Sequence, residues 1–416
     1  MAGARPKSVD PALVVRLAEE HGTPYYLYDA ALIRSRVDDL AAFDVLRFAQ
    51  KACSNLNILR LLREAGCVVD SVSRGEIERA VRAGFSGGGE PSGIVFTADV
   101  IDEATLDLCV ESDIPVNAGS PDMLEQLGRR SPGHRVWLRV NPGFGHGHSR
   151  QTNTGGEWSK HGIWHEYLDE ALRPIEKFRL DLVGLHMHIG SGSDFEHLGR
   201  VCDAMVAQVR ALGMDVRGIS GGGGLPIPYV PGQQEFDTAA LYRLWDVARR
   251  EVESIVGHPV SLEIEPGRYV VGEAGVLVAE VRALKRSGGT HYTLVDAGFD
   301  NLPRPVMYGS HHEISVVKRQ GVEALGPGLP TVVGGPLCES GDVFTQTEGG
   351  VVVPREIPEA EVGDYVLIHD AGAYAASMAS NYNTRPLAPE ILFEDGQARL
   401  IRRRQRAEEL IDLEDV

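Results

Sequence analysis

The fold of this chain is decided by the stretch 45-VLRFAQKACSN-55, in which an apolar strand passes directly into the start of a helix. Residues 45–49 are apolar apart from one arginine and predict a buried strand. Ser54 and Asn55 are helix-capping residue types, and residues 56–65 carry apolar side chains at helical spacing until Gly66. Lys51 therefore lies where a β-strand gives way to an α-helix, which is where active-site groups lie in parallel α/β proteins.

Lys51 has a chemical use at such a junction. An amine in a partly desolvated site loses its proton readily enough to form a Schiff base with a carbonyl compound. The alternative is a solvated surface lysine, which is the usual state of this residue type. The position at the strand end makes Lys51 a candidate catalytic residue.

The same alternation of strand and helix continues through the first two-thirds of the chain. Strands are predicted at 45–50, 67–72, 93–98, 114–117, 135–140, 181–188, 215–220 and 259–265. Helices are predicted at 55–65, 74–83, 102–111, 120–128, 165–175, 196–212 and 237–254. Eight strands alternating with helices predict an α/β fold in which a parallel sheet closes into a (β/α)8 barrel, and we expect this domain to cover residues 30–275.

After residue 275 the pattern changes to short β-rich runs separated by turn residues. The runs are 275–284, 291–297, 331–335 and 365–369. They predict a second, C-terminal antiparallel β domain over residues 276–416. We expect residues 1–29 to join it, because the run 24–28 reads as one further strand.

Composition bounds the class of protein. The chain has 416 residues, 43% of them hydrophobic, and a net charge of −18, which disfavours nucleic acid or an anionic membrane as a partner. It has no apolar stretch of about eighteen residues and no signal-peptide pattern, so we expect a cytoplasmic protein. Its five cysteines are scattered, with no CxxC pair. That usage favours reduced thiols over disulfides or structural zinc, and we expect no metal.

The sixth predicted strand ends in 184-GLHMHIGS-191. Alternation along the strand turns His186 and His188 to the same side. Two histidines at this spacing could bind a metal, but no acidic third ligand stands beside them, which favours a flat ring partner instead. Ser191 and the glycine before it offer a hydroxyl and amides to an anion. His186 alone fits equally well as a core histidine with its hydrogen bonds satisfied.

Two more strand ends add a phosphate site and a carboxylate. The run 220-SGGGGL-225 follows the seventh strand, where barrels tend to bind phosphate, although a flexible turn is the alternative. The eighth strand ends in 263-EIEPGR-268, in which Glu263 and Glu265 share a face and Arg268 suits a phosphate. An amine, a ring-stacking histidine, a phosphate-binding run and a carboxylate for a ring nitrogen together indicate a pyridoxal 5'-phosphate site.

At these residues the chain resembles the diaminopimelate decarboxylase family, in the alanine-racemase-like class of pyridoxal-phosphate enzymes. The resemblance runs from about Tyr25 to Arg403. It rests on 49-AQKACSN-55, 69-VDSVS-73, residues 186–191, 221–224 and 265–268, 304-RPVMYG-309, 338-CESGD-342 and 370-DAGAY-374. It implies decarboxylation of meso-2,6-diaminopimelate to L-lysine and carbon dioxide through an external aldimine, the last step of lysine biosynthesis. It also implies a head-to-tail homodimer whose subunits share active sites.

The resemblance also implies roles for single residues. Lys51 holds the cofactor as an internal aldimine, His188 stacks on its ring, and Glu265 pairs with the ring nitrogen. Alanine racemases of the same class have an arginine in the place of Glu265, so this carboxylate favours decarboxylation. The implied cofactor-binding residues are Lys51, Asp70, His188, Ser191, Gly222, Gly223, Gly224, Glu265, Pro266, Gly267, Arg268 and Tyr374.

On the same basis Cys338 protonates the carbanionic intermediate, and a set of polar residues binds the substrate: Arg268, Arg304, Tyr308, Glu339 and Tyr374. Arginines suit a distal carboxylate, which lysine and ornithine lack at that end, and a buried guanidinium without an anion is costly. Carboxynorspermidine carries a carboxylate and stays an alternative to diaminopimelate. A non-catalytic, cofactor-binding regulator is a third reading, although it predicts loss of Lys51, Glu265 or Cys338, and all three are present.

Two places depart from the family's usual pattern. His161 lies in the long insertion 142–162, where the family usually has an aromatic residue, and this affects how the loop packs. Gln50 and Cys53 replace the commoner valine and asparagine beside Lys51, so the neighbours of the amine differ.

Overall fold

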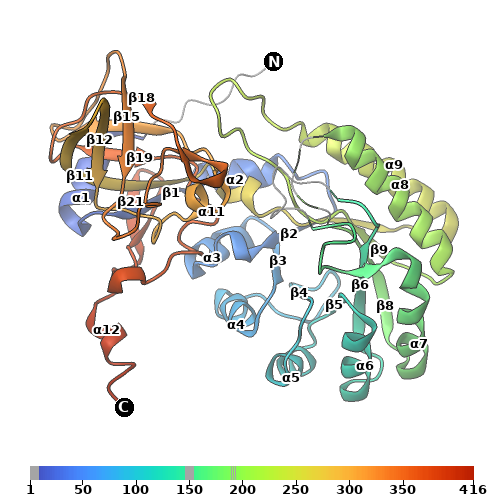
Figure 1. The fold of residues 1–416 in the computed structure, drawn as a ribbon. Helices are drawn as coiled ribbons and strands as arrows, with labels where there is room; N and C mark the ends of the chain where they lie inside the picture. The colour runs from blue at the N-terminus through green and yellow to red at the C-terminus, as the bar shows by residue number, and fades with distance from the viewer. Residues whose placement is uncertain (1–8, 146–153, 189, 191, 193) are drawn as a thin grey trace. The chain divides into compact units, whose positions relative to one another are not determined.

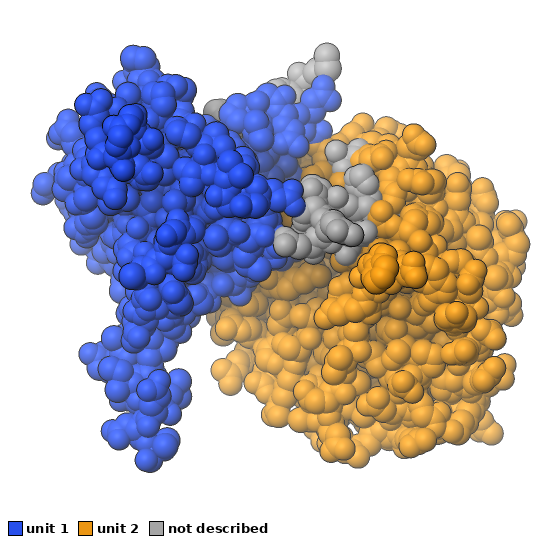
Figure 2. Space-filling view, in the orientation of Figure 1, with its two compact units in different colours: residues 1–33, 227–235, 271–416 blue, residues 34–226, 236–270 orange. Residues whose placement is uncertain are grey.

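The structure is a computed structural model, and it describes residues 9–145, 154–188, 190, 192 and 194–416. The chain divides into two compact units, coloured separately in Figure 2. Residues 34–226 and 236–270 form the first, called here the barrel unit. Residues 1–33, 227–235 and 271–416 form the second, the β unit.

The barrel unit contains a closed parallel sheet. Within the described residues eight strands follow one another in the order β5-β4-β3-β2-β10-β9-β8-β6, and pairing of β5 with β6 closes the ring. The strands are β2 (Val45–Ala49), β3 (Val68–Ser71), β4 (Ile94–Ala98), β5 (Val116–Ala118), β6 (Arg135–Asn141), β8 (Asp181–His186), β9 (Gly218–Ser220) and β10 (Ser261–Ile264). The short β7 (Ile163–Trp164) pairs with the end of β6. The predicted (β/α)8 barrel is confirmed.

Helices connect these strands and lie outside the ring, as Figure 1 shows for α4 to α9. They are α2 (Ala30–Asp38), α3 (Leu56–Glu64), α4 (Arg74–Ala83), α5 (Glu103–Glu111), α6 (Pro121–Arg130), α7 (Leu168–Phe178), α8 (Phe195–Leu212), α9 (Thr238–Val256) and α10 (Arg268–Val271). Helix α3 follows the sequence signals closely. The side chain of Asn55 accepts a hydrogen bond from the amide of Asn57, and the apolar face from Ile58 to Leu62 is buried.

The β unit is built on one mostly antiparallel sheet, in the order β14-β13-β19-β11-β1-β20-β21, with β12, β15 and β18 attached through β11. Its strands are β1 (Tyr25–Asp29), β11 (Gly275–Ser287), β12 (Thr290–Val295), β13 (Ile314–Lys318), β14 (Val322–Glu323), β15 (Leu329–Gly334), β18 (Arg355–Ile357), β19 (Tyr365–Ile368), β20 (Glu390–Glu394) and β21 (Gln397–Arg402). A separate pair is formed by β16 (Gln346–Thr347) and β17 (Val351–Val352). The predicted second β domain is confirmed.

The N-terminal strand joins this sheet as expected. Strand β1 pairs antiparallel with β11 and parallel with β20. Helix α1 (Pro11–His21) covers it and buries Leu17 against Leu27 and Val278. Short helices α11 (Arg304–Tyr308) and α12 (Glu408–Ile411) complete the unit.

One segment does not follow the order of the sequence. Residues 227–235 stand between two parts of the barrel unit in the chain, but they pack with the β unit and are called here the inserted segment. No periodic pattern marks this exchange. A separate observation concerns membranes: among the described residues, no helix combines the length and apolar character needed to cross one.

Candidate active site

Lys51 lies in a single 3-10 turn, Gln50–Ala52, directly after β2, and its side chain is exposed. The strand-end segment 265–268 lies against this turn. The carbonyl of Pro266 accepts a hydrogen bond from the amide of Ala49 at 3.0 Å, and a Cβ added to Gly267 would come within 3.2 Å of Ala52. The structure thus brings together the turn of Lys51 and the segment of Pro266, which are 215 residues apart in the sequence.

His188 and the glycine run form one close-packed surface. The Nδ1 of His188 accepts a hydrogen bond from the amide of Gly223 at 2.8 Å, so this nitrogen carries a lone pair. Gly222 has a φ of +64°, and a Cβ there would lie 2.6 Å from the Met187 carbonyl. A Cβ on Gly223 would lie 2.3 Å from the carbonyl of Glu265. Side chains are therefore excluded from this run, and its backbone can approach a phosphate closely.

The ring of His188 is kept neutral. Desolvation, followed by the charge of Lys51, holds the pKa of His188 well below its usual value. A neutral, half-buried imidazole is suited to stacking on an aromatic ring.

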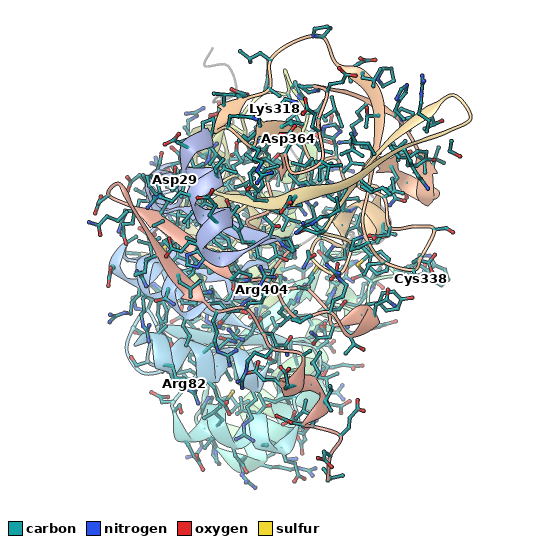
Figure 3. The ribbon with its side chains drawn as sticks, turned by 90° about the vertical axis from the view of Figure 1, so that its left-hand side faces the viewer. Asp29, Arg82, Lys318, Cys338, Asp364 and Arg404 are labelled. Atoms are coloured by element: carbon teal, nitrogen blue, oxygen red, sulfur yellow. The ribbon has the colours of Figure 1, made fainter. Side chains whose placement is uncertain are left out.

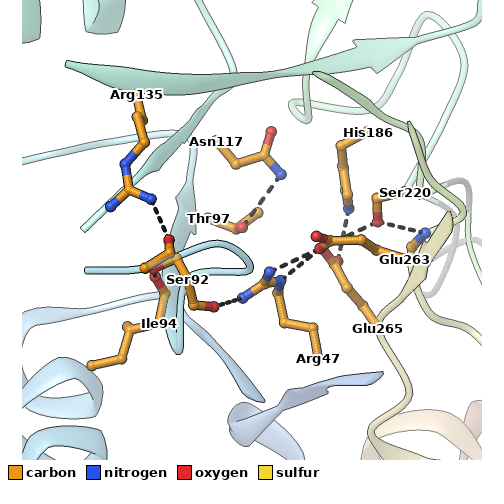
Figure 4. A network of polar contacts seen from close by, with 12 residues as sticks. Arg47, Ser92, Ile94, Thr97, Asn117, Arg135, His186, Ser220, Glu263 and Glu265 are labelled. Atoms are coloured by element: carbon orange, nitrogen blue, oxygen red, sulfur yellow. Dashed lines mark hydrogen bonds and ion pairs between the residues drawn. The ribbon is translucent and has the colours of Figure 1, made fainter. Parts of the chain in front are cut away.

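Glu265 lies in a buried polar network inside the barrel (Figure 4). One of its oxygens, Oε2, lies 2.7 Å from the Nε2 of His186, and Oε1 lies 3.4 Å from the hydroxyl of Ser220. Burial alone raises the pKa of Glu265, but the charge and hydrogen bond of His186, with the charges of Arg47 and Arg139, together leave the pKa below its usual value. Glu265 is therefore an anion, as a partner for a protonated ring nitrogen must be.

The neighbouring carboxylate has a partner of its own. Glu263 accepts hydrogen bonds from Nε and Nη2 of Arg47 at 3.0 and 2.8 Å, and both side chains are almost fully buried. The Nη1 of Arg47 donates to the carbonyl of Ser92. Glu263 on β10 and Glu265 directly after it thus have separate partners, Arg47 and His186.

Asp70 completes this interior layer from β3. Burial, and after it the charge of Glu265, raises the pKa of Asp70 to about 6, whereas Lys51 lowers it. Its Oδ1 and the Nδ1 of His186 are buried and have no hydrogen-bond partner among the described residues. Buried polar atoms in this state indicate that another molecule completes the site.

These features fit pyridoxal phosphate. The barrel unit contains the amine of Lys51, the neutral ring of His188, the glycine run and the anionic Glu265. It also contains the two buried polar atoms described above, Oδ1 of Asp70 and Nδ1 of His186, which can hydrogen-bond to a ligand. Ser191, a predicted phosphate ligand, lies outside the described residues. Arg268 begins α10 and is half-buried.

Sequence reasoning missed one charged residue of this interior. Arg139, on β6, is 7% exposed, and its charge is among those that lower the pKa of Glu265 against the effect of burial. The signal was available, because 135-RVWLRVN-141 places an arginine in the middle of an apolar barrel strand.

The unusual His161 has a specific partner. Its Nδ1 pairs with Oδ2 of Asp99, which follows β4, and the amide of Gly162 donates to Oδ1 of the same aspartate at 3.2 Å. The long insertion also reaches the site, since the hydroxyl of Thr154 donates to the carbonyl of His188 at 2.9 Å. Within the described part of this loop, a polar anchor stands where the family usually has an aromatic residue.

In the β unit, Arg304 begins helix α11 and is 2% exposed. Its Nη1 donates to the hydroxyl of Tyr229 at 2.7 Å and to Nε2 of His312 at 3.2 Å. Among the residues that the structure describes, no carboxylate pairs with Arg304, and no acceptor meets its Nε or Nη2. A buried guanidinium without an anion is costly, which makes Arg304 a candidate to bind an anionic ligand.

The remaining predicted residues of the β unit lie on turns. Cys338 and Glu339 are exposed on one turn, and Cys338 is labelled in Figure 3. The turn is held by Asp342, which accepts from the amides of Leu337 and Phe299, both at 2.8 Å. Tyr308 ends α11 and is half-buried. Tyr374 follows β19 with a positive φ of 57°.

Cys338 differs from the other four cysteines. They are buried, and burial raises the pKa of Cys67, Cys109 and Cys202 to about 12. Cys338 is exposed on a polar turn, where a thiol can exchange a proton with a ligand.

Comparison with known proteins agrees with this site. Residues 32–272 match the family model described as "Pyridoxal-dependent decarboxylase, pyridoxal binding domain". The diaminopimelate decarboxylase of Streptomyces coelicolor is 60% identical over 406 residues, covering 98% of this chain and 92% of the relative. A crystal structure of a diaminopimelate decarboxylase is 60% identical, covers 96% of each chain and superposes with a TM-score of 0.94.

A more distant solved structure shows a ligand. The diaminopimelate decarboxylase of Helicobacter pylori, in a crystal structure complexed with L-lysine, is 31% identical, with a TM-score of 0.82 over 96% of this chain and 98% of that one. Fold, site chemistry and sequence identity along nearly the whole chain agree, and this chain belongs to the diaminopimelate decarboxylase family of pyridoxal-dependent carboxy-lyases.

Proposed function

We propose that the decarboxylation of meso-2,6-diaminopimelate by this chain depends on Lys51, Glu265, Arg304 and Cys338 in four separate roles. Bound pyridoxal phosphate supplies an electron sink for the electron pair left when carbon dioxide departs. Lys51 would hold the cofactor through its Nζ. Glu265, kept anionic by His186, would hold a proton at the ring nitrogen, which strengthens the sink.

The other groups bind and orient the cofactor and substrate. The neutral ring of His188 would lie against the cofactor ring, and the amides of Gly222 to Gly224, with Ser191, Arg268 and Tyr374, would take its phosphate. Asp70, Pro266 and Gly267 would complete the cofactor site through the buried layer and the close approach to the turn of Lys51.

Arg304 carries the assignment of substrate. In its buried guanidinium, Nε and Nη2 have no acceptor among the described residues, and the edge that they form can bind a carboxylate through two hydrogen bonds. Diaminopimelate has a carboxylate at its distal end, whereas lysine and ornithine would leave the guanidinium unpaired. Arg268, Tyr308, Glu339 and Tyr374 are the other proposed substrate contacts, with Glu339 receiving the distal ammonium.

Cys338 would deliver a proton to the substrate carbon that loses carbon dioxide. The support is its exposure on a polar turn, in contrast to the four buried cysteines. We infer further that the chain acts as a homodimer in which the β unit of one subunit completes the site of the other, and that it works in the cytoplasm, where its free thiols stay reduced.

Carbon dioxide release tests the substrate. The purified holoenzyme is supplied with meso-diaminopimelate, lysine, ornithine and carboxynorspermidine in parallel, and again as the Arg304→Met variant. We expect release from diaminopimelate only, with kcat/KM lowered at least about 100-fold by the substitution, on the scale of a lost charged pair. Release from lysine or carboxynorspermidine at comparable kcat/KM would contradict the assignment of Arg304.

Subunit mixing tests the shared site. Lys51→Ala and Cys338→Ala proteins, each inactive, are mixed under conditions in which subunits exchange. Random pairing gives hybrids in half of the dimers, each with one intact site, so about one quarter of wild-type activity should return. No recovery despite demonstrated exchange would refute sites shared between subunits.

A further inference from the structure

Among the residues that the structure describes, the side chain of Arg304 is hydrogen-bonded through Nη1 and not through Nε or Nη2. Its Nη1 donates both to the hydroxyl of Tyr229 and to Nε2 of His312, and its guanidinium carbon lies 4.9 Å from the centre of the Tyr229 ring. The rings of Tyr229 and His312 meet edge to face, with their centres 5.5 Å apart. The side chains of Tyr229 and His312 therefore both contact the Nη1 side of the guanidinium, and the pair is called here the mount of Arg304.

The protonation of His312 is determined by its other contact. Its Nδ1 lies 2.8 Å from the carbonyl of His369, and a carbonyl only accepts, so Nδ1 carries the proton. The Nε2 of a neutral ring is then a lone-pair acceptor, which is what the N–H of Arg304 needs. The second proton of an imidazolium would point at the guanidinium and would be repelled by its charge.

The surroundings keep the ring neutral. His312 is 1% exposed, and burial, followed by the charge of Arg304, holds its pKa well below the usual value. The other charged or titratable groups that act on it are Arg355 and His311, and both also disfavour a second proton. Since Arg355 donates to the backbone carbonyl of His312 at 2.7 Å, the residue is fixed at both ends.

Tyr229 comes from the inserted segment, residues 227–235. This segment follows the glycine run 221–224 in the chain, yet it packs with the β unit. A residue that interrupts the barrel sequence thus supplies half of the mount for an arginine on helix α11.

This arrangement leaves the Nε–Nη2 edge of Arg304 without an acceptor among the described residues. That edge binds a carboxylate side-on through two parallel hydrogen bonds. We propose that His312 and Tyr229 are positioning residues that fix Arg304 with this edge free, and so determine selectivity for a ligand with a carboxylate at the distal end. The inference rests on the proposed role of Arg304.

The test separates carboxylate-bearing ligands from one without a carboxylate. KM and kcat are measured for meso-diaminopimelate, together with inhibition constants for L-lysine and 1,5-diaminopentane. L-lysine bound as the product has its carboxylate at the distal end, in the opposite direction to lysine bound as a substrate, and 1,5-diaminopentane has no carboxylate. The variants are His312→Leu, His312→Gln and Tyr229→Phe. His311→Gln is the matched control, because His311 is the adjacent histidine and makes no hydrogen bond to Arg304 in the structure.

We expect His312→Leu and Tyr229→Phe each to raise KM for diaminopimelate and the inhibition constant of L-lysine about five- to tenfold. This is less than the loss of a direct hydrogen bond to a charged group, because Arg304 itself is retained. The value of kcat and the inhibition constant of 1,5-diaminopentane should change less than about twofold, because uniform binding is lost without loss of chemistry. His312→Gln supplies a carbonyl oxygen as acceptor and should restore most of the affinity.

Two outcomes would overturn the proposal. If the inhibition constant of 1,5-diaminopentane rises as much as that of L-lysine, the substitutions damage the site generally. If KM for diaminopimelate and the inhibition constant of L-lysine are both unchanged, the mount does not position Arg304. Arg304→Met distinguishes the second case: if that variant binds diaminopimelate poorly while the mount variants do not, only the positioning role fails. If Arg304→Met is also without effect, the proposed role of Arg304 itself fails.

Discussion

Replacing His186 with leucine should weaken cofactor binding through Glu265. In the structure, His186 Nε2 is 2.7 Å from Glu265 Oε2 in a site where both residues are less than 10% exposed. Burial raises the pKa of Glu265, and His186 is the foremost group that lowers it. Without the imidazole, the pKa of Glu265 should rise, and the protonated carboxyl would no longer stabilise a proton on the ring nitrogen of the cofactor.

The magnitude follows from the kind of contact. A hydrogen bond to a buried charged group contributes about 1.5–3 kcal/mol, so the dissociation constant for pyridoxal phosphate should rise roughly 10- to 150-fold. The loss should be larger at pH 6.5 than at pH 8.5, because the raised pKa protonates the variant's Glu265 first at the lower pH. His186→Gln keeps an N–H donor and should retain most of the affinity.

The assay is titration of the apoprotein with pyridoxal phosphate, followed by absorbance at both pH values. It is combined with the ¹⁵N chemical shift of labelled cofactor, which reports protonation of the ring nitrogen. His134→Leu is the matched control, because His134 is also buried and hydrogen-bonded but precedes β6, at the opposite end of the barrel strands. Unchanged affinity and ¹⁵N shift in His186→Leu, or equal loss in His134→Leu, would refute the reasoning.

Two further predictions concern stability. Arg47→Met leaves Glu263 buried without a cation and should lower the free energy of unfolding of the apoprotein, measured by urea titration, by about 3–5 kcal/mol. The double variant Arg47→Met/Glu263→Gln should recover part of this loss, and if it is no more stable than Arg47→Met, loss of the ion pair is not the cause. Burial raises the pKa of Glu76 to about 7, above that of an unfolded chain, so the native state binds more protons and the free energy of unfolding falls as pH rises from about 4.5 to 7. Glu76→Gln should show a smaller fall over that window, and an identical pH slope in both proteins would contradict the pKa.

Local periodicity was enough to predict the architecture. Strand β2 and helix α3 follow from the apolar spacing and the Asn55 cap. Repetition of such strand–helix units along the chain predicts a barrel. The candidate residues at the strand ends could also be predicted from the sequence, since parallel strands bring their carboxyl ends to one edge of a sheet.

The partners of these residues were not predictable in that way. Arg47 and Glu263 lie on neighbouring strands but 216 residues apart in the chain, and their contact depends on the β2–β10 register that closes the ring. His186 and Glu265 lie 79 residues apart, at the end of β8 and directly after β10, and β9 separates these two strands in the sheet. The inserted segment, residues 227–235, was missed for another reason: it has no regular period, and contacts such as that of Tyr229 with Arg304 are made with residues distant in the sequence.

The barrel interior shows how the family's carboxylate is kept ionised among other acids. The charge of Glu265 raises the pKa of both Asp70 and Glu263, and burial acts to raise the pKa of all three carboxyl groups. Arg47 neutralises Glu263 directly, so the imidazole of His186 remains for Glu265, and the charge of Arg139 reinforces it. Burial and the charge of Glu265 raise the pKa of Asp70 to about 6, although the charge of Lys51 and a hydrogen bond with Thr97 oppose the rise. Of the three buried carboxyl groups of Asp70, Glu263 and Glu265, Glu265 is the one whose pKa is lowered. In its proposed role it would keep a proton on the ring nitrogen, which favours decarboxylation over racemisation in this class of site.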